Sequence, residues 1–217
     1  MELLAINLAT ARQVEFHQRV ISTGIYKMPV PHSVKVTALG LEGDVQVDRE
    51  NHGGPDKAIY VYTLENYRFW ERELQRESYP YGQFGENFTV TGMPDERIHI
   101  GDLFRIGAIL VQVTQPRVPC YKLGIKMSDP AFVKRFLTSG RVGFYLRVLE
   151  EGEVRAGERI VRVREDPERL DIRDAMLALI KGPRQKTVIE RALRIEALSA
   201  AWRNDLSKRL NAASSAS

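Results

Sequence analysis

The chain has 217 residues, of which 43% are hydrophobic and 28% are charged, and its formal net charge is +4. These values are typical of a folded globular chain and exclude a largely disordered one. No apolar run is long enough for a membrane span or a signal segment. The single cysteine cannot form an internal disulfide, so we expect a reducing compartment, the cytoplasm.

Short strands dominate the prediction for the first three quarters of the chain. The clearest pair lies in residues 102–115, where apolar and more polar residues alternate from Ile109 onwards and Gly107 marks a hairpin turn. A second strand pair is predicted in residues 143–163, with its turn at 151–153. Other runs rich in Val, Ile and Tyr are also predicted to be strands, at residues 3–9, 24–30, 32–41 and 57–63.

Two predicted helices interrupt these strands. Residues 63–77 place apolar side chains at helical spacing behind a Thr63 cap. Residues 129–140 begin with Asp-Pro and stop at Gly140. Because strands and helices do not alternate regularly, the pattern favours a β-barrel over a doubly wound parallel sheet. We therefore predict a mainly β fold with peripheral helices.

The composition changes after about residue 164, which divides the predicted organisation into a β-barrel domain (1–164) and a C-terminal segment of three small helices (165–211). The last helix carries Leu198, Trp202 and Leu206 on one face. Residues 212–217, rich in Ala and Ser, are predicted to be a flexible tail.

The cysteine, Cys120, lies in the stretch PRVPCYKLG at the end of a predicted strand. Two prolines restrict the backbone there, so we expect the thiol on a stiff loop. Arg117 and Lys122 favour the thiolate, the form that attacks electrophiles and binds metals. A single cysteine is also often a small buried apolar residue, and the residues alone leave both interpretations open.

A tight turn at His52-Gly53-Gly54-Pro55 is a second candidate. Its backbone N–H groups are suited to an anion, and Lys57, expected at the start of the next strand, adds a positive charge. An ordinary glycine turn followed by an exposed lysine is an alternative explanation of the same residues.

Two further polar side chains stand near glycines. Asn87 follows Gly85 and carries both donors and an acceptor for a heterocycle edge, or it caps a turn. Arg141 lies between two glycines and is suited to a phosphate or carboxylate, or it is a solvated loop charge.

Taken together, these motifs resemble the MOSC domain family, and more narrowly its short bacterial YiiM type. The resemblance runs from about residue 41 to about residue 163, and the helical tail is similar to the C-terminal segment of that type. Five stretches carry it in the same order and spacing, at residues 41–70, 82–92, 100–107, 113–124 and 139–160.

The resemblance implies a MOSC-type β-barrel that binds the molybdenum cofactor, a molybdenum ion held by a pterin dithiolene with a phosphate tail. Cys120 matches the family's protein ligand to molybdenum, and a soft thiolate suits such a centre. The resemblance places four residues near the anionic end of the cofactor: His52, Gly53, Gly54 and Lys57. Asn87, Arg117 and Arg141 match other motif positions, and we infer that they also bind the cofactor.

The activity that we expect is reduction of N-hydroxylated compounds, notably N-hydroxylated purine bases, to the parent amines. His52 or Tyr121 is the expected proton donor, and a separate protein must supply electrons because no flavin or iron–sulfur motif is present. The sequence leaves open whether the protein forms a homodimer. The alternative is a sulfur carrier that holds a persulfide on Cys120. Nucleic-acid binding is not favoured, because no groove-reading motif is present.

Overall fold

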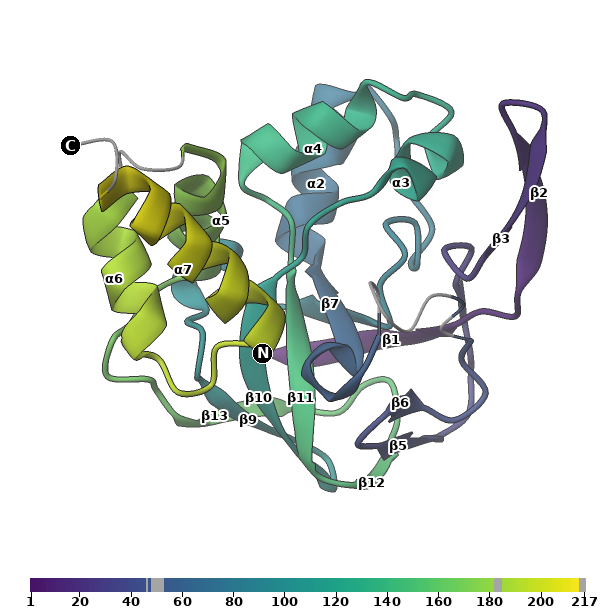
Figure 1. The fold of residues 1–217 in the computed structure, drawn as a ribbon. Coiled ribbons are helices and arrows are strands. Elements are labelled where there is room, and N and C mark those ends of the chain that lie inside the picture. Colours follow the sequence, from purple (N-terminus) through teal and green to yellow (C-terminus); the bar gives the residue numbers. More distant parts are fainter. Residues whose placement is uncertain (46, 48–52, 182–184, 215–217) are drawn as a thin grey trace.

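The computed structural model describes residues 1–45, 47, 53–181 and 185–214. Its strands are β1 (Glu2–Leu8), β2 (Arg12–Phe16), β3 (Arg19–Thr23), β4 (Met28–Pro29), β5 (Val34–Thr37), β6 (Gly40–Leu41), β7 (Ile59–Thr63), β8 (Phe88–Thr91), β9 (Leu103–Ile106), β10 (Ile109–Pro116), β11 (Phe144–Glu150), β12 (Gly152–Val154) and β13 (Ile160–Arg164). Its helices are η1 (Pro55–Lys57), α2 (Leu64–Glu73), η2 (Asp95–Arg97), α3 (Tyr121–Lys126), α4 (Phe132–Ser139), α5 (Ile172–Lys181), α6 (Lys186–Arg194) and α7 (Ala200–Ser214). A mainly β fold with peripheral helices is therefore confirmed (Figure 1).

The main sheet has eight strands in the order β13-β9-β10-β11-β7-β8-β1-β4. All neighbours are antiparallel except β7 and β8. The predicted closed barrel is not found among the described residues. The start of β1 meets the approach to β13 through an isolated bridge between Glu2 and Arg159, where backbone hydrogen bonds link Met1 and Leu3 to residues 157–160, and no strand ladder forms between these described segments. The far end of the same edge of β1 pairs with β4, at Asn7 and Leu8, so two short contacts stand where a barrel would have one ladder.

An aromatic cluster joins helices α2 and α4 to the sheet. Trp70 on α2 donates a hydrogen bond from Nε1 to the hydroxyl of Tyr62 on β7, at 2.8 Å. The ring centroids of Tyr62 and Phe84 are 4.5 Å apart, and those of Trp70 and Phe132 are 4.8 Å apart. Phe136 on α4 is fully buried in the same cluster. Rings of this size bury large apolar areas, so the cluster fixes both helices over one end of the sheet.

The predicted helix signals at two positions are confirmed. The Thr63 hydroxyl accepts a hydrogen bond from the backbone N–H of Asn66 at 3.2 Å and so caps α2. Helix α4 stops at Gly140, which has φ +68°, a left-handed conformation that favours glycine.

The hairpin predicted in residues 143–163 is wrong. Strand β11 pairs with β10 and β7, whereas β12 leaves the main sheet and pairs with β5. Gly152 lies in β12, and a Cβ atom built on it would be 2.8 Å from the Cβ of Ala108. This glycine therefore permits close approach to another segment, and it does not form the predicted turn.

Strand β10 is buried on both faces, which the alternating pattern did not predict. Ile109 and Val113 are fully buried on one face, and Gln112 and Thr114 are also buried. The backbone carbonyl of Thr114 accepts a hydrogen bond from the N–H of Ser199 at 3.3 Å, because the C-terminal helices approach this strand.

The C-terminal helices α5, α6 and α7 gather at one side of the sheet (Figure 1). Trp202 and Leu206 are 4% and 2% exposed, so the predicted apolar stripe packs inwards. Helix α7 runs three residues into the predicted tail, and residues 215–217 lie outside the described part. No helix in the described part of the chain is both long and apolar enough to cross a membrane.

Candidate functional site

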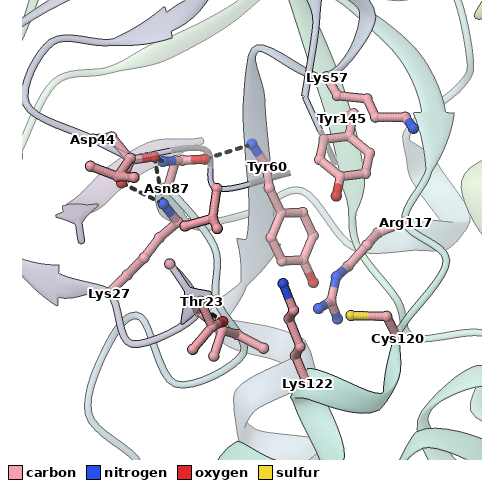
Figure 2. A pocket seen from close by; sticks show the side chains of 15 residues that line it. Thr23, Lys27, Asp44, Lys57, Tyr60, Asn87, Arg117, Cys120, Lys122 and Tyr145 are labelled. Carbon is pink, nitrogen blue, oxygen red and sulfur yellow. Dashed lines mark hydrogen bonds and ion pairs between the residues drawn. The ribbon is translucent and has the colours of Figure 1, made fainter. Parts of the chain in front are cut away.

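One pocket gathers most of the candidate residues that the structure describes (Figure 2). It lies where the end of β3, the loop before β7 and the turn between β10 and α3 meet. Among the predicted residues, those that line it are Lys57, Asn87, Arg117 and Cys120. Residues that the sequence analysis did not assign to the site also line it: Thr23, Gly24, Ile25, Lys27, Asp44, Val45, Val47, Tyr60, Gly85, Lys122 and Tyr145.

Cys120 stands at the start of a short helix that the sequence analysis missed. It follows β10 by four residues and is the N-cap residue of α3, with an extended backbone. Its side chain makes no capping hydrogen bond and is partly exposed to the pocket. The predicted position after a strand is confirmed, but the expected loop leads directly into α3. The helix itself was not predicted, because six residues that include Gly124 carry no usable helical period.

Arg117 is a buried cation beside this thiol. The residue is 6% exposed, and its Nη1 atom has no hydrogen-bond partner in the described part of the protein. Its guanidinium carbon lies 4.8 Å from the ring centroid of Tyr60 and 5.5 Å from that of Phe136. Figure 2 shows the guanidinium beside the sulfur of Cys120. A buried donor without a partner is costly, so this site is suited to an anionic ligand that accepts a hydrogen bond.

Two tyrosine hydroxyl groups face the same space. Burial raises the pKa of Tyr60 well above its ordinary value, and burial also raises the pKa of Tyr145 although Arg117 opposes this shift. Both phenols therefore stay protonated near neutral pH. The hydroxyl of Tyr60 donates to the carbonyl of Val142 at 2.9 Å. Tyr145 is thus the tyrosine whose hydroxyl is better placed to serve as a donor within the pocket.

The other wall of the pocket is a buried charge network. Lys27 Nζ lies 2.5 Å from Asp44 Oδ2, and the two side chains are 8% and 4% exposed. Asn87 Nδ2 donates to Asp44 Oδ2 at 2.8 Å, and Asn87 Oδ1 accepts from the backbone N–H of Tyr60 at 3.1 Å. Burial lowers the pKa of Lys27, while Asp44 opposes that shift. Both ends of the Asn87 amide are used within the protein, so this side chain holds Asp44 and β7 in place.

The remaining predicted residues lie elsewhere. Gly54 has φ +88° and precedes η1, where Lys57 lies, so Lys57 does not enter β7 as expected. Neither Gly53 nor Gly54 lines the pocket, and His52 lies outside the described residues. Tyr121 points away from the pocket and stacks on Phe16 of the β2–β3 hairpin, with ring centroids 5.3 Å apart.

Arg141 also lies away from the pocket. Its Nη1 donates to Asn66 Oδ1 at 3.3 Å, and its guanidinium covers the ring of Phe69 at 4.7 Å. Asn66 in turn donates to Asp95, which is fully buried. The structure therefore assigns Arg141 to the contact between α2 and the loop before β11. Its flanking glycines serve the backbone: Gly140 ends α4, and Gly143 passes close to β7.

Lys27 and Asp44 are the main residues that sequence reasoning missed. They are 17 residues apart, and Asn87 is 43 residues beyond Asp44. Within its own stretch of sequence, each is an ordinary polar residue that no motif marks. Only the burial of all three side chains at one point identifies them.

Comparisons with known proteins identify the family of this chain. The MOSC domain profile matches residues 48–161. The Bacillus subtilis protein YflK is 40% identical over 207 residues, which cover 95% of this chain and 93% of YflK. The crystal structure of YiiM from Geobacillus stearothermophilus has a TM-score of 0.82 and 33% identity, and the match covers 96% of this chain and 98% of that one.

A fungal relative carries a functional name. A protein of Gibberella moniliformis named "Reductase" is 36% identical over 143 residues, which cover 64% of this chain but only 25% of that protein. The family match includes more than half of the chain, and the similarity to YflK and YiiM extends over nearly all of it. The chain belongs to the MOSC domain family.

Proposed function

We propose that this protein is a molybdenum cofactor-dependent reductase that converts N-hydroxylated compounds, such as N-hydroxylated purine bases, to the parent amines and so detoxifies them. The observation that carries the proposal is the buried, unpaired Nη1 of Arg117 beside the partly exposed Cys120 in one pocket. Its membership of the MOSC family and its relative named "Reductase" support the same class of chemistry.

The pocket residues fit such a cofactor. Cys120 offers a soft sulfur ligand, which suits a metal already held by sulfur donors. Arg117, Lys122 and Lys57 offer positive charge to the anionic pterin and phosphate groups. When bound, the molybdenum cofactor supplies two-electron chemistry at the N–O bond. The overall reaction consumes two electrons and two protons and yields the amine and water.

The residues of this chain bind and orient the cofactor and the substrate and supply protons to the reaction. Arg117 and Lys122 hold negative charge near Cys120, and the Lys27–Asp44 pair keeps the opposite wall rigid. The hydroxyl of Tyr145 stays protonated and donates a hydrogen bond to the bound ligand. Gly53, Gly54 and His52 are proposed to join the anionic end of the site. We propose that electrons come from a separate protein and that the reaction takes place in the cytoplasm.

An activity assay tests this proposal. The parent protein, loaded with cofactor, should reduce hydroxylaminopurine when a chemical reductant is supplied, and the Cys120→Ala protein should lose this activity. Asp205→Asn on the exposed side of α7 is the matched control and should keep it. Full activity in a folded Cys120→Ala protein removes the metal-ligand role.

The alternative of a sulfur carrier depends on the same thiol. Intact-mass analysis separates the two functions, because a persulfide adds one sulfur atom at Cys120 and requires no molybdenum. A persulfide on the purified protein, together with no molybdenum, would favour the alternative.

A further inference from the structure

A second hollow lies next to the pocket of Cys120 and shares one wall with it. Its lining includes Arg12, Tyr26, Lys27, Tyr81, Gln83 and Lys126. These residues come from the start of β2, the segment leading into β4, the loop before Phe84 and the end of α3. Lys27 lines both spaces, so it separates this hollow from the cofactor pocket. We call it the basic aromatic hollow.

Two cations from different elements share one aromatic ring in this hollow. The guanidinium carbon of Arg12 lies 4.6 Å from the ring centroid of Tyr26, and Nζ of Lys126 lies 5.6 Å from it. Neither cation forms an ion pair within the described part of the chain, and no Asp or Glu is among the residues that line the hollow. Lys27 is paired with Asp44. The charge of Glu86 acts on Lys126, whose pKa burial lowers to about 8. Arg12 is therefore the cation of the hollow that no carboxylate of the described residues compensates.

Lys126 is held in place by the backbone. Its Nζ donates to the carbonyls of Ile25 and Gly82, at 2.9 and 2.5 Å. These bonds use two of its three N–H donors and leave one. Holding the loop ends explains the position of Lys126. Arg12 is an exposed side chain that lines the hollow and stands over the same ring, so it can contact a ligand there.

On the other side of the hollow, contacts within the protein hold Tyr81 and Gln83 in fixed positions. The ring of Tyr81 packs edge-on against Tyr67, with centroids 5.8 Å apart. Gln83 donates from Nε2 to the sulfur of Met127 at 3.2 Å, which fixes the amide and leaves its Oε1 as an acceptor. The Tyr81 ring provides a surface for a flat ring, and a fixed amide can recognise a heterocycle edge.

We propose that the basic aromatic hollow is a second ligand site for a mononucleotide, that is, a planar heteroaromatic group joined to a phosphate ester. The phosphate lies beside Arg12 and Lys126, and the ring lies on Tyr81. Arginine and lysine are the usual partners of phosphate oxygens. This site is independent of the molybdenum chemistry proposed for the neighbouring pocket.

Calorimetric titration of the cofactor-free protein tests this site, with adenosine monophosphate and flavin mononucleotide as probes in a phosphate-free buffer. At least one probe should bind, whereas adenosine and inorganic phosphate should each bind at least about tenfold more weakly, because each lacks half of the contacts. Arg12→Gln should weaken binding by about tenfold, because a charge-assisted hydrogen bond is lost. Arg19→Gln is the matched control, since Arg19 is exposed on the same hairpin but does not line this hollow.

Several outcomes would overturn the site. They are failure of both probes to bind, inorganic phosphate binding as tightly as the nucleotide, and equal losses in Arg12→Gln and Arg19→Gln, which indicate unspecific attraction. The Lys122→Gln protein separates the two spaces, because Lys122 lines the cofactor pocket and not this hollow: nucleotide binding should remain there. Loss of binding in Lys122→Gln would assign the ligand to the cofactor pocket and contradict the second site.

Discussion

Lys27 and Asp44 carry opposite charges at a point that water hardly reaches. Removing one partner of a buried pair leaves the other charge without compensation, whereas removing both often costs little. The position of the pair on the pocket wall also means that its loss would disturb Asn87 and the start of β7. The Lys27–Asp44 pair therefore holds this wall of the pocket in place.

Asp44→Asn should therefore lower the free energy of unfolding by about 3 kcal/mol or more, as measured by urea denaturation. The double variant Lys27→Met with Asp44→Asn should recover most of that loss. Asp205→Asn, which alters an exposed carboxylate, should stay within about 0.5 kcal/mol of the parent. If Asp44→Asn is as stable as this control, the pair does not support the pocket wall.

Asp95 is a second buried acid, and it gives the protein a pH dependence. Burial raises its pKa from the ordinary 3.8 to about 7, although hydrogen bonds from Asn66 and from the backbone of Gly143 oppose the shift. The folded state thus binds a proton more tightly than the unfolded state does. Its contribution to stability is fully present below about pH 4 and is lost as the pH rises to about 7.

The parent should consequently have a higher urea midpoint at about pH 4.5 than at about pH 7.5, as far as Asp95 determines it. Other groups titrate in this range, so the informative quantity is the difference between variants. Asp95→Asn should reduce the loss of stability with rising pH, and Asp205→Asn should not. Parallel pH profiles for Asp95→Asn and the parent would show that this carboxyl does not titrate as described.

The sequence identified single residues best where the chemistry is local. Cys120 and Arg117 are three positions apart, so their neighbourhood could be predicted from one stretch. Lys27 and Asp44 could not be predicted, because only the folded chain brings their charges together out of water. Arg141 was assigned to the cofactor because it matches a family motif position, yet it contacts Asn66 and Phe69 away from the pocket.

Among the elements, helices with strong end signals were predictable. Thr63 caps α2 and Gly140 ends α4 through local hydrogen bonding and backbone conformation, which the sequence records directly. Helix α3 carried no such signal. Strand β12 was misassigned because Gly152 has two explanations, a turn or a close approach, and only its neighbour Ala108 decides between them.

Gly143 gives an element-scale test of close approach. It has φ +70°, and a Cβ there would be 2.3 Å from the carbonyl oxygen of Val61 on β7. Gly157 has φ +92° with nothing within 4 Å of such a Cβ. Gly157→Ala should cost about 1 kcal/mol through backbone strain alone. Gly143→Ala should cost at least about 2 kcal/mol more, because β11 and β7 must move apart.

Thermal or urea unfolding of the two alanine variants measures that difference. Equal losses would mean that the β7–β11 contact adapts without cost and that φ alone requires glycine at Gly143. Because the carbonyl of Gly143 accepts the backbone N–H of Arg117 at 3.1 Å, the Gly143→Ala protein should also bind the cofactor more weakly.

At the scale of the whole molecule, the many short strands in the sequence correctly indicated a mainly β fold. They did not indicate whether the sheet closes into a barrel. Whether a sheet closes depends on which edges meet, and β1 shares one edge between β4 and the approach to β13. The helical tail is likewise tied to the site through contacts that no local pattern records. Asp56 accepts from the N–H of Ala200 at 3.1 Å and pairs with Arg147, next to Lys57.

The molybdenum and pterin content of the protein, purified from a host that makes the cofactor, tests the central claim most directly. The parent and Asp205→Asn should retain near-stoichiometric metal and pterin. Cys120→Ser, shown to be folded by its unfolding midpoint, should lose most of the metal because its sulfur ligand is gone. A folded parent that retains neither component, or a Cys120→Ser protein with undiminished molybdenum, would contradict the proposal that this thiol holds the cofactor.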